Sequence, residues 1–234
     1  MALPPIWLLF LGALAVRKVS AEPLPLREDL IPLDGFEGAA LLAGAEARAG
    51  YAALDRHFVG QVHPAFCGPA TMAILLNALH EAPDGVRRLR PFDQSNVFTP
   101  EVARLRARNR VARAGMPLAI LARALAAHGL AVETRYVDET GVDAFRDLAR
   151  AALATGDRFA AVNYDRPALG QQGKGHISPL AAYNGAADRF LVLDVARAKY
   201  PPTWVETAVL HDAMRRPGGG RPSRGFVLAG RQPS

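Results

Sequence analysis

Cysteine is nearly absent from this sequence of 234 residues, which contains only Cys67. A single cysteine cannot form an intramolecular disulfide, and it excludes a metal site built from several thiolates. Histidine supplies no replacement, because the five histidines other than His176 show no metal-ligand spacing with partners. A lone cysteine is more often an inert core residue than a nucleophile, so its neighbours must decide which it is.

A strong excess of charge is also missing. The formal net charge is +6, charged residues make up 21% of the chain, and no basic run is interleaved with aromatic residues. This is too mild to indicate nucleic-acid binding, so we expect no nucleic-acid partner. A weaker alternative to a solvated basic surface is that the positive charge attracts a small anionic substrate. With half of its residues hydrophobic, the chain is expected to form one globular domain or two lobes sharing a cleft.

No hydrophobic run is long enough for a comfortable membrane span. Residues 6–16 are apolar, and Val19, Ser20 and Ala21 fit the small-residue pattern of a cleavage site. We therefore expect residues 1–21 to be a signal peptide and residues 22–234 to be a single exported domain, periplasmic or otherwise extracytoplasmic. The basic pair Arg17 and Lys18 follows the apolar run instead of preceding it, which leaves an uncleaved membrane anchor as the alternative.

Sequence periodicity and capping residues predict helices in the first part of the chain and strands in the second. The expected helices cover residues 35–51, 68–79, a short segment that begins after Thr99 as its N-cap, 116–128 and 142–155. The expected strands cover residues 131–137, 159–164, 176–183, 189–195 and 224–229. This order indicates an α+β architecture.

Cys67 comes directly before the predicted helix at residues 68–79, and Pro69 suits the first turn of that helix. A thiol at a helix N-terminus is close to the positive end of the helix dipole, which favours the nucleophilic thiolate. Gln61 lies six residues upstream. Its amide could donate to a carbonyl under attack at Cys67 and form an oxyanion hole with the backbone N–H of Cys67.

His176 and Asp194 lie on two consecutive predicted strands. If Tyr183 and Arg189 close the hairpin, the numbers of paired residues sum to 372, and Asp194 becomes the diagonal neighbour of His176 on one face. The carboxylate would then fix the imidazole tautomer and stabilise its charged form. The order Cys, His, Asp is typical of papain-type enzymes. On these residues alone, a core histidine beside a turn aspartate remains an open alternative.

Several blocks of the sequence resemble the catalytic domain of phytochelatin synthases. They are Gln-Val-His-Pro-Ala-Phe-Cys-Gly at residues 61–68 with Leu-Asn-Ala-Leu at 76–79, Gly-His-Ile-Ser-Pro-Leu-Ala-Ala-Tyr at 175–183, Asp-Val-Ala-Arg-Ala-Lys-Tyr-Pro-Pro-Thr-Trp-Val at 194–205, and Ser-Arg-Gly-Phe-Val at 223–227. The resemblance extends over roughly residues 31–229. It implies a papain-like cysteine peptidase fold, in which a helical lobe with the Cys67 helix packs on an antiparallel sheet lobe with His176 and Asp194.

The family acts on glutathione, and the resemblance implies a role for each candidate residue. Cys67 attacks the Cys–Gly amide, His176 passes the thiol proton to the leaving glycine, Asp194 orients His176, and Gln61 stabilises the oxyanion. The resulting γ-glutamylcysteinyl thioester is released to water or transferred to a second glutathione to give a phytochelatin. Plant-type members carry a Cys-rich C-terminal extension that compact bacterial members lack. This chain has no second cysteine, so we expect hydrolysis at least as much as transfer.

Substrate binding is expected to involve arginine, since a guanidinium matches a carboxylate in shape and charge. Arg166 aligns with a family position and is the first candidate for the γ-glutamyl carboxylate, with Arg224 second. Arg197 and Tyr200 would order their loop or contact substrate. For each arginine, a surface salt bridge is the alternative.

We expect no cofactor and no metal site in the protein. A heavy-metal ion such as Cd²⁺ or Zn²⁺ would enter only in a complex with glutathione thiolate. A homodimer is left open. A general papain-like peptidase acting on other peptides, and a non-catalytic exported binding protein, are the alternative functions.

Overall fold

The computed structural model describes residues 23–80 and 91–232. The predicted signal peptide at residues 1–21 lies outside the described residues. Within them, no helix combines the length and the apolar character needed to cross a membrane.

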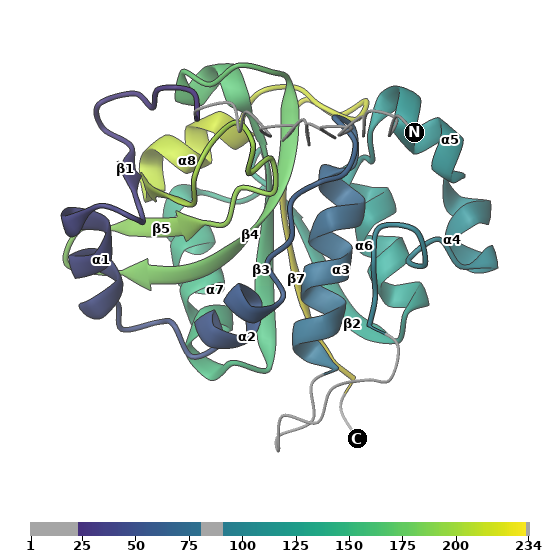
Figure 1. Ribbon diagram of the computed structural model, residues 1–234, viewed down its shortest axis with the longest axis horizontal. Coiled ribbons are helices and arrows are strands. Elements are labelled where there is room, and N and C mark those ends of the chain that lie inside the picture. Colours follow the sequence, from purple (N-terminus) through teal and green to yellow (C-terminus); the bar gives the residue numbers. More distant parts are fainter. Residues whose placement is uncertain (1–22, 81–90, 233–234) are drawn as a thin grey trace, which may run out of the picture.

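A seven-stranded antiparallel sheet forms the centre of the fold (Figure 1). From one edge to the other its strands are β1 (Ile31–Pro32), β6 (Thr203–Glu206), β5 (Arg189–Val192), β4 (Gly175–Asn184), β3 (Arg158–Asp165), β7 (Gly225–Arg231) and β2 (Leu130–Tyr136). The central strands β3 and β4 are almost entirely buried, which explains why they read as apolar runs and not as alternating patterns.

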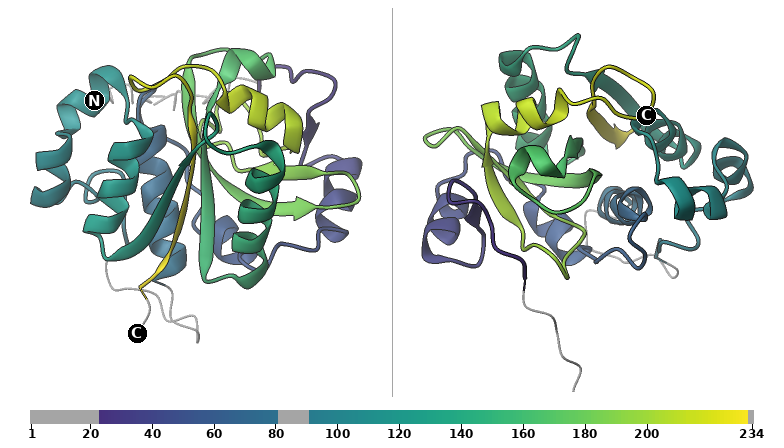
Figure 2. Two further views of the ribbon diagram at one scale, coloured as in Figure 1. Left: turned by 180° about the vertical axis from the view of Figure 1, so that it is seen from behind. Right: turned by 90° about the horizontal axis from the view of Figure 1, so that it is seen from above.

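Helices cover both faces of the sheet (Figures 1 and 2). The face that carries the Cys67 helix is covered by α1 (Phe36–Ala43), α2 (Tyr51–Arg56), α3 (Cys67–Leu79) and α6 (Leu118–Ala127). On the same side, α4 (Pro100–Leu105) packs on α6, and α5 (Arg108–Ala114) lies at the periphery. The opposite face is covered by α7 (Val142–Thr155) and α8 (Thr207–Met214). The predicted combination of helices with an antiparallel sheet is therefore confirmed.

The helix α3 is buried along nearly its whole length, which accounts for its mostly apolar sequence. Its buried hydroxyl, Thr71 Oγ1, donates to the backbone oxygen of Ile177 in β4 over 3.2 Å. This bond satisfies a polar group that would otherwise be costly to bury. It also ties the Cys67 helix to the strand that carries His176.

Two of the predicted elements differ from the structure. The helix expected at residues 35–51 is wrong as one unit, because α1 ends at Ala43 and α2 begins at Tyr51. Between them Ala47 pairs with Tyr183 of β4 through N–H···O bonds of 3.4 and 2.8 Å, so this segment forms a β-bridge to the sheet instead of a helical turn. Strand β5 ends at Val192, before the predicted end at residue 195.

Six short elements were not predicted from the sequence, namely β1, α2 apart from Tyr51, α5, the 3-10 helix at Arg166–Leu169, β6 and α8. Each has eight residues or fewer, and periodicity is a weak signal over so short a length.

Candidate active site

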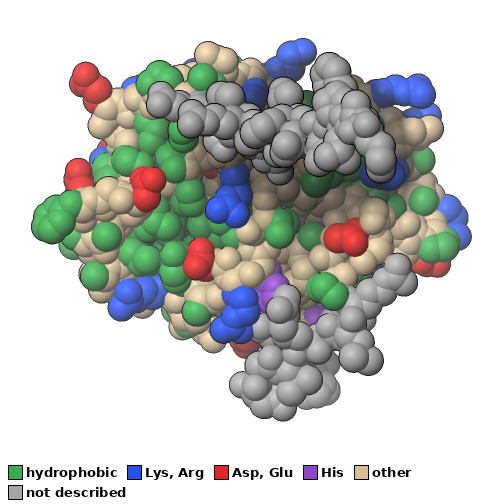
Figure 3. Space-filling model, in the orientation of Figure 1, with side chains coloured by type: hydrophobic (Ala, Val, Ile, Leu, Met, Phe, Trp, Pro, Cys, Tyr) green, Lys and Arg blue, Asp and Glu red, His purple; other side chains and the backbone are tan. Residues whose placement is uncertain are grey.

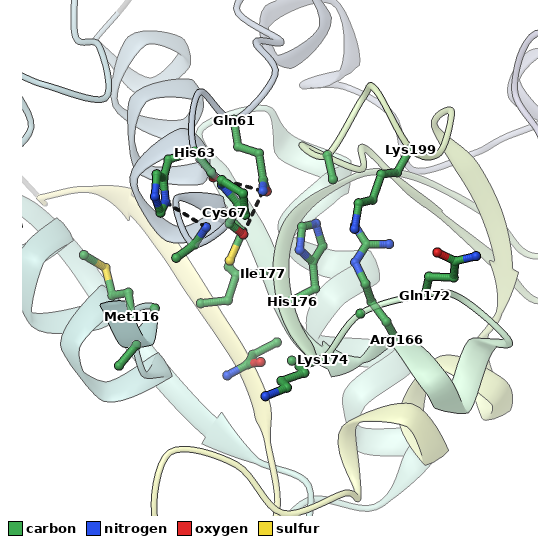
Figure 4. A pocket seen from close by; sticks show the side chains of 18 of the residues that line it. Gln61, His63, Cys67, Met116, Arg166, Gln172, Lys174, His176, Ile177 and Lys199 are labelled. Carbon is green, nitrogen blue, oxygen red and sulfur yellow. Dashed lines mark hydrogen bonds between the residues drawn. The ribbon is translucent and has the colours of Figure 1, made fainter. Parts of the chain in front are cut away.

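A cavity of about 970 Å³ opens where the N-terminus of α3 meets the start of β4 (Figure 4). Its wall includes Cys67 from α3, His176 from β4, Gln61 from the loop before α3, and Met116 from the segment between α5 and α6. The structure therefore brings three of the four predicted catalytic side chains to one hollow. The fourth, Asp194, lies directly behind His176, as its hydrogen bond shows.

A β-bulge places His176 and Asp194 on the same face of the sheet. Near its turn the hairpin pairs Tyr183 with Phe190, one residue away from the register that we predicted. A bulge at Ala181 then shifts the pairing by one residue, and beyond it the predicted register holds. Without this extra residue, the alternation along β4 would point His176 to the opposite face. Our single-register prediction was wrong at the turn and agrees with the pairing of Leu180 with Val192 beyond the bulge.

Asp194 is buried and gathers four hydrogen bonds. Its Oδ1 accepts from His176 Nε2 at 2.9 Å, from Arg166 Nη2 at 2.7 Å and from the backbone N–H of Ala196 at 2.8 Å. Its Oδ2 accepts from the Tyr164 hydroxyl at 3.4 Å. Burial opposes the ionised form, but the charges and hydrogen bonds of His176 and Arg166 outweigh it and hold the pKa of Asp194 far below its usual range.

Cys67 and His176 favour each other's charged forms. Burial raises the pKa of the Cys67 thiol, but its hydrogen bond with His176, the imidazolium charge, and backbone bonds from Ile177 and Gly68 outweigh this and lower the pKa. Burial likewise lowers the pKa of His176, and Asp194 together with Cys67 raises it. Because Nε2 of His176 is bonded to Asp194, Nδ1 is the ring nitrogen left for the thiol. The arrangement suits a thiolate–imidazolium pair.

Gln61 lines the cavity, but its amide bonds within its own loop. Nε2 donates to the backbone oxygens of His63 and Pro64 at 3.1 and 2.9 Å, and Oε1 is buried without a hydrogen-bond partner. The loop is held from the side by buried Gln94, whose Oε1 accepts from Val62 N and whose Nε2 donates to Gly60 O, both at 2.9 Å. In this state, therefore, the donors of Gln61 are not directed at Cys67.

The predicted substrate-binding residues fall into different places. Arg166 borders the cavity, yet its Nη1 and Nη2 already bond to Gln171 Oε1 and Asp194 Oδ1 at 2.7 Å each. Tyr200 is buried, and its hydroxyl accepts from the backbone N–H of Gln172 at 2.7 Å. Arg197 lines the cavity while packing over the Phe58 ring at 4.6 Å.

Arg224 is less fully engaged than Arg166. It lines the cavity and donates over long distances, 3.5 Å to Asn163 Oδ1 and 3.3 Å to Asp165 Oδ1. Its Nε is buried without a hydrogen-bond partner. Gly175 makes room for this side chain, because a Cβ there would lie 2.3 Å from Arg224 Nη1. Arg224 therefore lines the cavity with a guanidinium that its protein partners hold only loosely.

Positive charge dominates the cavity. Its lining includes Arg113, Arg166, Lys174, Arg197, Lys199 and Arg224, and no Asp or Glu stands among the described residues that line it. Within the described part of the chain, Arg113, Lys174 and Lys199 form no ion pair. Figure 4 shows Lys174 and Lys199 on different sides of His176. Such a lining fits an anionic ligand.

Several side chains around the site escaped the sequence analysis. Tyr164 stands directly opposite His176 in the pairing of β3 with β4, so strand pairing is the signal that would have found it. Gln94, Gln171 and Lys174 lie in loops, for which periodicity offers no signal. Across residues 23–80 and 91–232, no group of three or more His, Cys, Asp or Glu side chains could hold a metal ion.

Comparison with known proteins assigns the sequence to a family. The family model described as phytochelatin synthase matches residues 21–226. Glutathione gamma-glutamylcysteinyltransferase 3 of Lotus japonicus is 35% identical over 70% of this chain and 34% of its own length. The Arabidopsis thaliana enzyme numbered 2 is 33% identical over 78% and 40%, and that of Schizosaccharomyces pombe (strain 972 / ATCC 24843) is 30% identical over 76% and 42%. The chain thus spans about a third to two fifths of these relatives.

Among solved structures, a double glycine motif protease from an AMS/PCAT transporter, in complex with the leader peptide, matches with a TM-score of 0.40. The two chains are 15% identical over 74% of this chain and 90% of the protease.

Proposed function

We propose, since the chain belongs to the phytochelatin synthase family, that it cleaves the Cys–Gly bond of glutathione through a thioester on Cys67. One observation carries the proposal: the thiol of Cys67, the imidazole of His176 and the carboxylate of Asp194 are connected in series at the wall of a cation-lined cavity. The papain-like assignment of the fold is supported by the position of the thiol at a helix N-terminus that packs against the strand of His176.

The first half of the reaction transfers the acyl group to the enzyme. The Cys67 thiolate attacks the carbonyl carbon between cysteine and glycine, and the backbone N–H of Cys67 stabilises the oxyanion. Gln61 supplies the second donor once its amide turns away from the carbonyls of His63 and Pro64. His176 then gives its proton to the glycine nitrogen as the C–N bond breaks. Glycine leaves, and a γ-glutamylcysteinyl thioester remains on Cys67.

The second half removes the acyl group. His176, now neutral, takes a proton from the attacking nucleophile while the C–S bond breaks. Water as nucleophile gives γ-glutamylcysteine, and the α-amino group of a second glutathione gives a phytochelatin. A heavy-metal ion takes part as a glutathione thiolate complex, that is, as part of the substrate.

The cations of the cavity select the substrate. Glutathione carries two carboxylates, and Arg224 lines the cavity with a guanidinium whose bonds to Asn163 and Asp165 are long, 3.5 and 3.3 Å, so a carboxylate can compete for it. Lys174 and Lys199, which form no ion pair in the described chain, add charge at the wall.

The product assay tests the proposed reaction. Purified reduced protein is incubated with glutathione near pH 8, and the products are identified by mass spectrometry, with Cys67→Ser as the control. We expect γ-glutamylcysteine and glycine from the wild type alone, and peptides with repeated γ-Glu-Cys units if transfer occurs. Cleavage of unrelated peptides but not of glutathione would indicate a general peptidase. Equal behaviour of wild type and Cys67→Ser would indicate a binding protein.

We also propose export, on the basis of the apolar segment and small-residue pattern within residues 1–21. The intact mass of the protein recovered from cells tests it, because cleavage after Ala21 leaves Glu22 as the first residue. A mass that retains residues 1–21 would favour the uncleaved anchor.

A further inference from the structure

One oxygen atom joins Arg166 to the catalytic series. Oδ1 of Asp194 accepts from both Arg166 Nη2 at 2.7 Å and His176 Nε2 at 2.9 Å. Arg166 and Asp194 are 4% and 2% exposed, so solvent screens this ion pair little. A positive charge is therefore fixed on the same atom that orients the imidazole.

The rest of the Arg166 side chain is held as firmly. Nη1 donates to Gln171 Oε1 at 2.7 Å, and the guanidinium lies 5.1 Å from the centre of the Tyr200 ring. The loop before β4 closes over the side chain at Gly173, where a Cβ would come within 2.9 Å of Arg166 Cδ. Gly173 also has a φ of +134°, which favours glycine. These contacts fit a built-in partner of Asp194 better than a mobile clamp for substrate.

We infer that Arg166 is a positioning residue that holds Asp194 against His176 and cancels its charge. The Asp194–Arg166 pair then acts on His176 as a neutral hydrogen-bond acceptor, the part that an asparagine plays in Cys-His-Asn enzymes. The inference rests on the proposed function only in taking Cys67 and His176 as the reacting pair. It replaces the expectation that Arg166 binds the γ-glutamyl carboxylate.

Few other charges face the imidazole. Cys67 approaches from α3, and Tyr164 from β3 lies edge-on at 5.6 Å. Burial raises the pKa of Tyr164, so this phenol stays neutral. Lys174 precedes His176 in the chain, and Arg197 and Lys199 border the same cavity beyond Asp194. Arg166 differs from these three cations in bonding directly to the carboxylate.

Removing either charge of the pair should shift the titration of Cys67 in opposite directions. Arg166→Met leaves an uncompensated negative charge, which disfavours the thiolate and favours the imidazolium. Both limbs of the pH profile then move to higher pH, by about one unit or more. Asp194→Asn leaves an uncompensated positive charge and moves both limbs to lower pH. The double variant carries neither charge and should return close to the wild-type profile.

The rate of alkylation by iodoacetamide measures the titration of Cys67 without any need for glutathione. Cys67 is the only cysteine, so its rate of modification between about pH 4 and pH 10 reports this thiolate alone. Failure to cleave glutathione would thus overturn the proposed function and leave this measurement intact. Opposite shifts that cancel in the double variant are the expected result, and a purely structural role would not produce them.

Two results would overturn the inference. One is a shift in Arg166→Met that persists unchanged in the double variant. The other is an unmoved pH profile with a KM for glutathione raised tenfold or more, which would make Arg166 a substrate clamp. Breaking a buried ion pair can unfold a protein. If Arg166→Met does not fold, the comparison of Asp194→Asn with the double variant decides alone. The double variant must then reverse the shift of the pH profile that Asp194→Asn produces.

Discussion

At the scale of single residues, the thiol of Cys67 shows which of several effects is decisive. A helix N-terminus stabilises a nearby negative charge by about 0.3–1 kcal/mol when the site is exposed. Full burial works against the thiolate and is the largest single influence on its pKa. The position of Cys67 at a helix N-terminus is therefore too weak by itself to lower the pKa of the buried thiol. The hydrogen bond and charge of His176 lower the pKa, so His176 does more than the helix end to favour the thiolate.

Arg224 carries the first prediction at this scale. We expect Arg224→Met to raise KM for glutathione about 10- to 100-fold with a smaller change in kcat. A hydrogen bond to a charged group contributes about 1.5–3 kcal/mol, and each 1.4 kcal/mol is about tenfold in affinity. Steady-state kinetics with glutathione, and with an analogue that lacks the γ-glutamyl carboxylate, measure it. For the analogue, KM should differ little between the wild type and Arg224→Met.

Arg110→Met is the matched control for this substitution. Arg110 is an exposed arginine of α5 that does not line the cavity, so its loss should leave KM unchanged. An Arg224→Met enzyme with unaltered KM would contradict a role for Arg224 in binding carboxylate.

At the scale of elements, the loop at residues 60–62 is held by one side chain from a distant loop and by a backbone bond from Gln61 N to Val195 O of 2.7 Å. Buried Gln94 bonds to the backbone on both sides of Gln61. We predict that Gln94→Ala lowers kcat about tenfold or more, since a buried backbone group left unpaired costs about 1–3 kcal/mol and Gln61 keeps only its backbone bond to Val195. Gln94→Glu keeps the acceptor for Val62 N and loses the donor to Gly60 O, so its kcat should lie between those of the wild type and Gln94→Ala.

Asn96→Ala separates this effect from general loosening of the segment. Asn96 bonds within its own turn, to Asp93 and to Pro91. Measurements of kcat and Tm on all three variants distinguish the roles: similar losses of kcat in Asn96→Ala and Gln94→Ala would mean that the segment, not the two bonds of Gln94, supports Gln61.

The hairpin of β4 and β5 shows how far sequence reasoning could go at this scale. The periodic helix α7 and the capping residue Thr99 were predicted correctly, because their signals are local. The face of His176 depends on the bulge at Ala181, and nothing in the sequence of the strand marks that position. The predicted register reached the right pairing only beyond the bulge.

Contacts between residues far apart in the chain also limited what could be predicted from the sequence. Arg166 was expected at a substrate carboxylate, and only the folded chain shows it on Asp194, 28 residues away. The resemblance to phytochelatin synthases is confirmed by the family model over residues 21–226. The roles of individual side chains stay predictions, because they depend on contacts that no local pattern encodes.

At the scale of the whole molecule, the placement of charge matters more than its sum. The net charge of +6 is modest. On the face shown in Figure 3, basic and acidic side chains are interspersed. The cavity, by contrast, contains cations and no carboxylate among its described lining residues. Fields from such a cleft draw anions in and weaken as salt shortens the Debye length from roughly 10 Å at 0.1 M to 3 Å at 1 M.

This field predicts how Cys67 reacts with reagents of different charge. At low salt, the cavity should speed the alkylation of Cys67 by anionic iodoacetate more than that by neutral iodoacetamide. The ratio of the two rates, iodoacetate to iodoacetamide, should fall severalfold between about 0.02 and 1 M salt. The double variant Lys174→Gln/Lys199→Gln should lower the ratio at low salt and flatten its salt dependence. Arg110→Gln/Arg215→Gln removes the same net charge from exposed positions that do not line the cavity. If both double variants lowered the ratio equally, the overall charge and not the cavity would attract the anion.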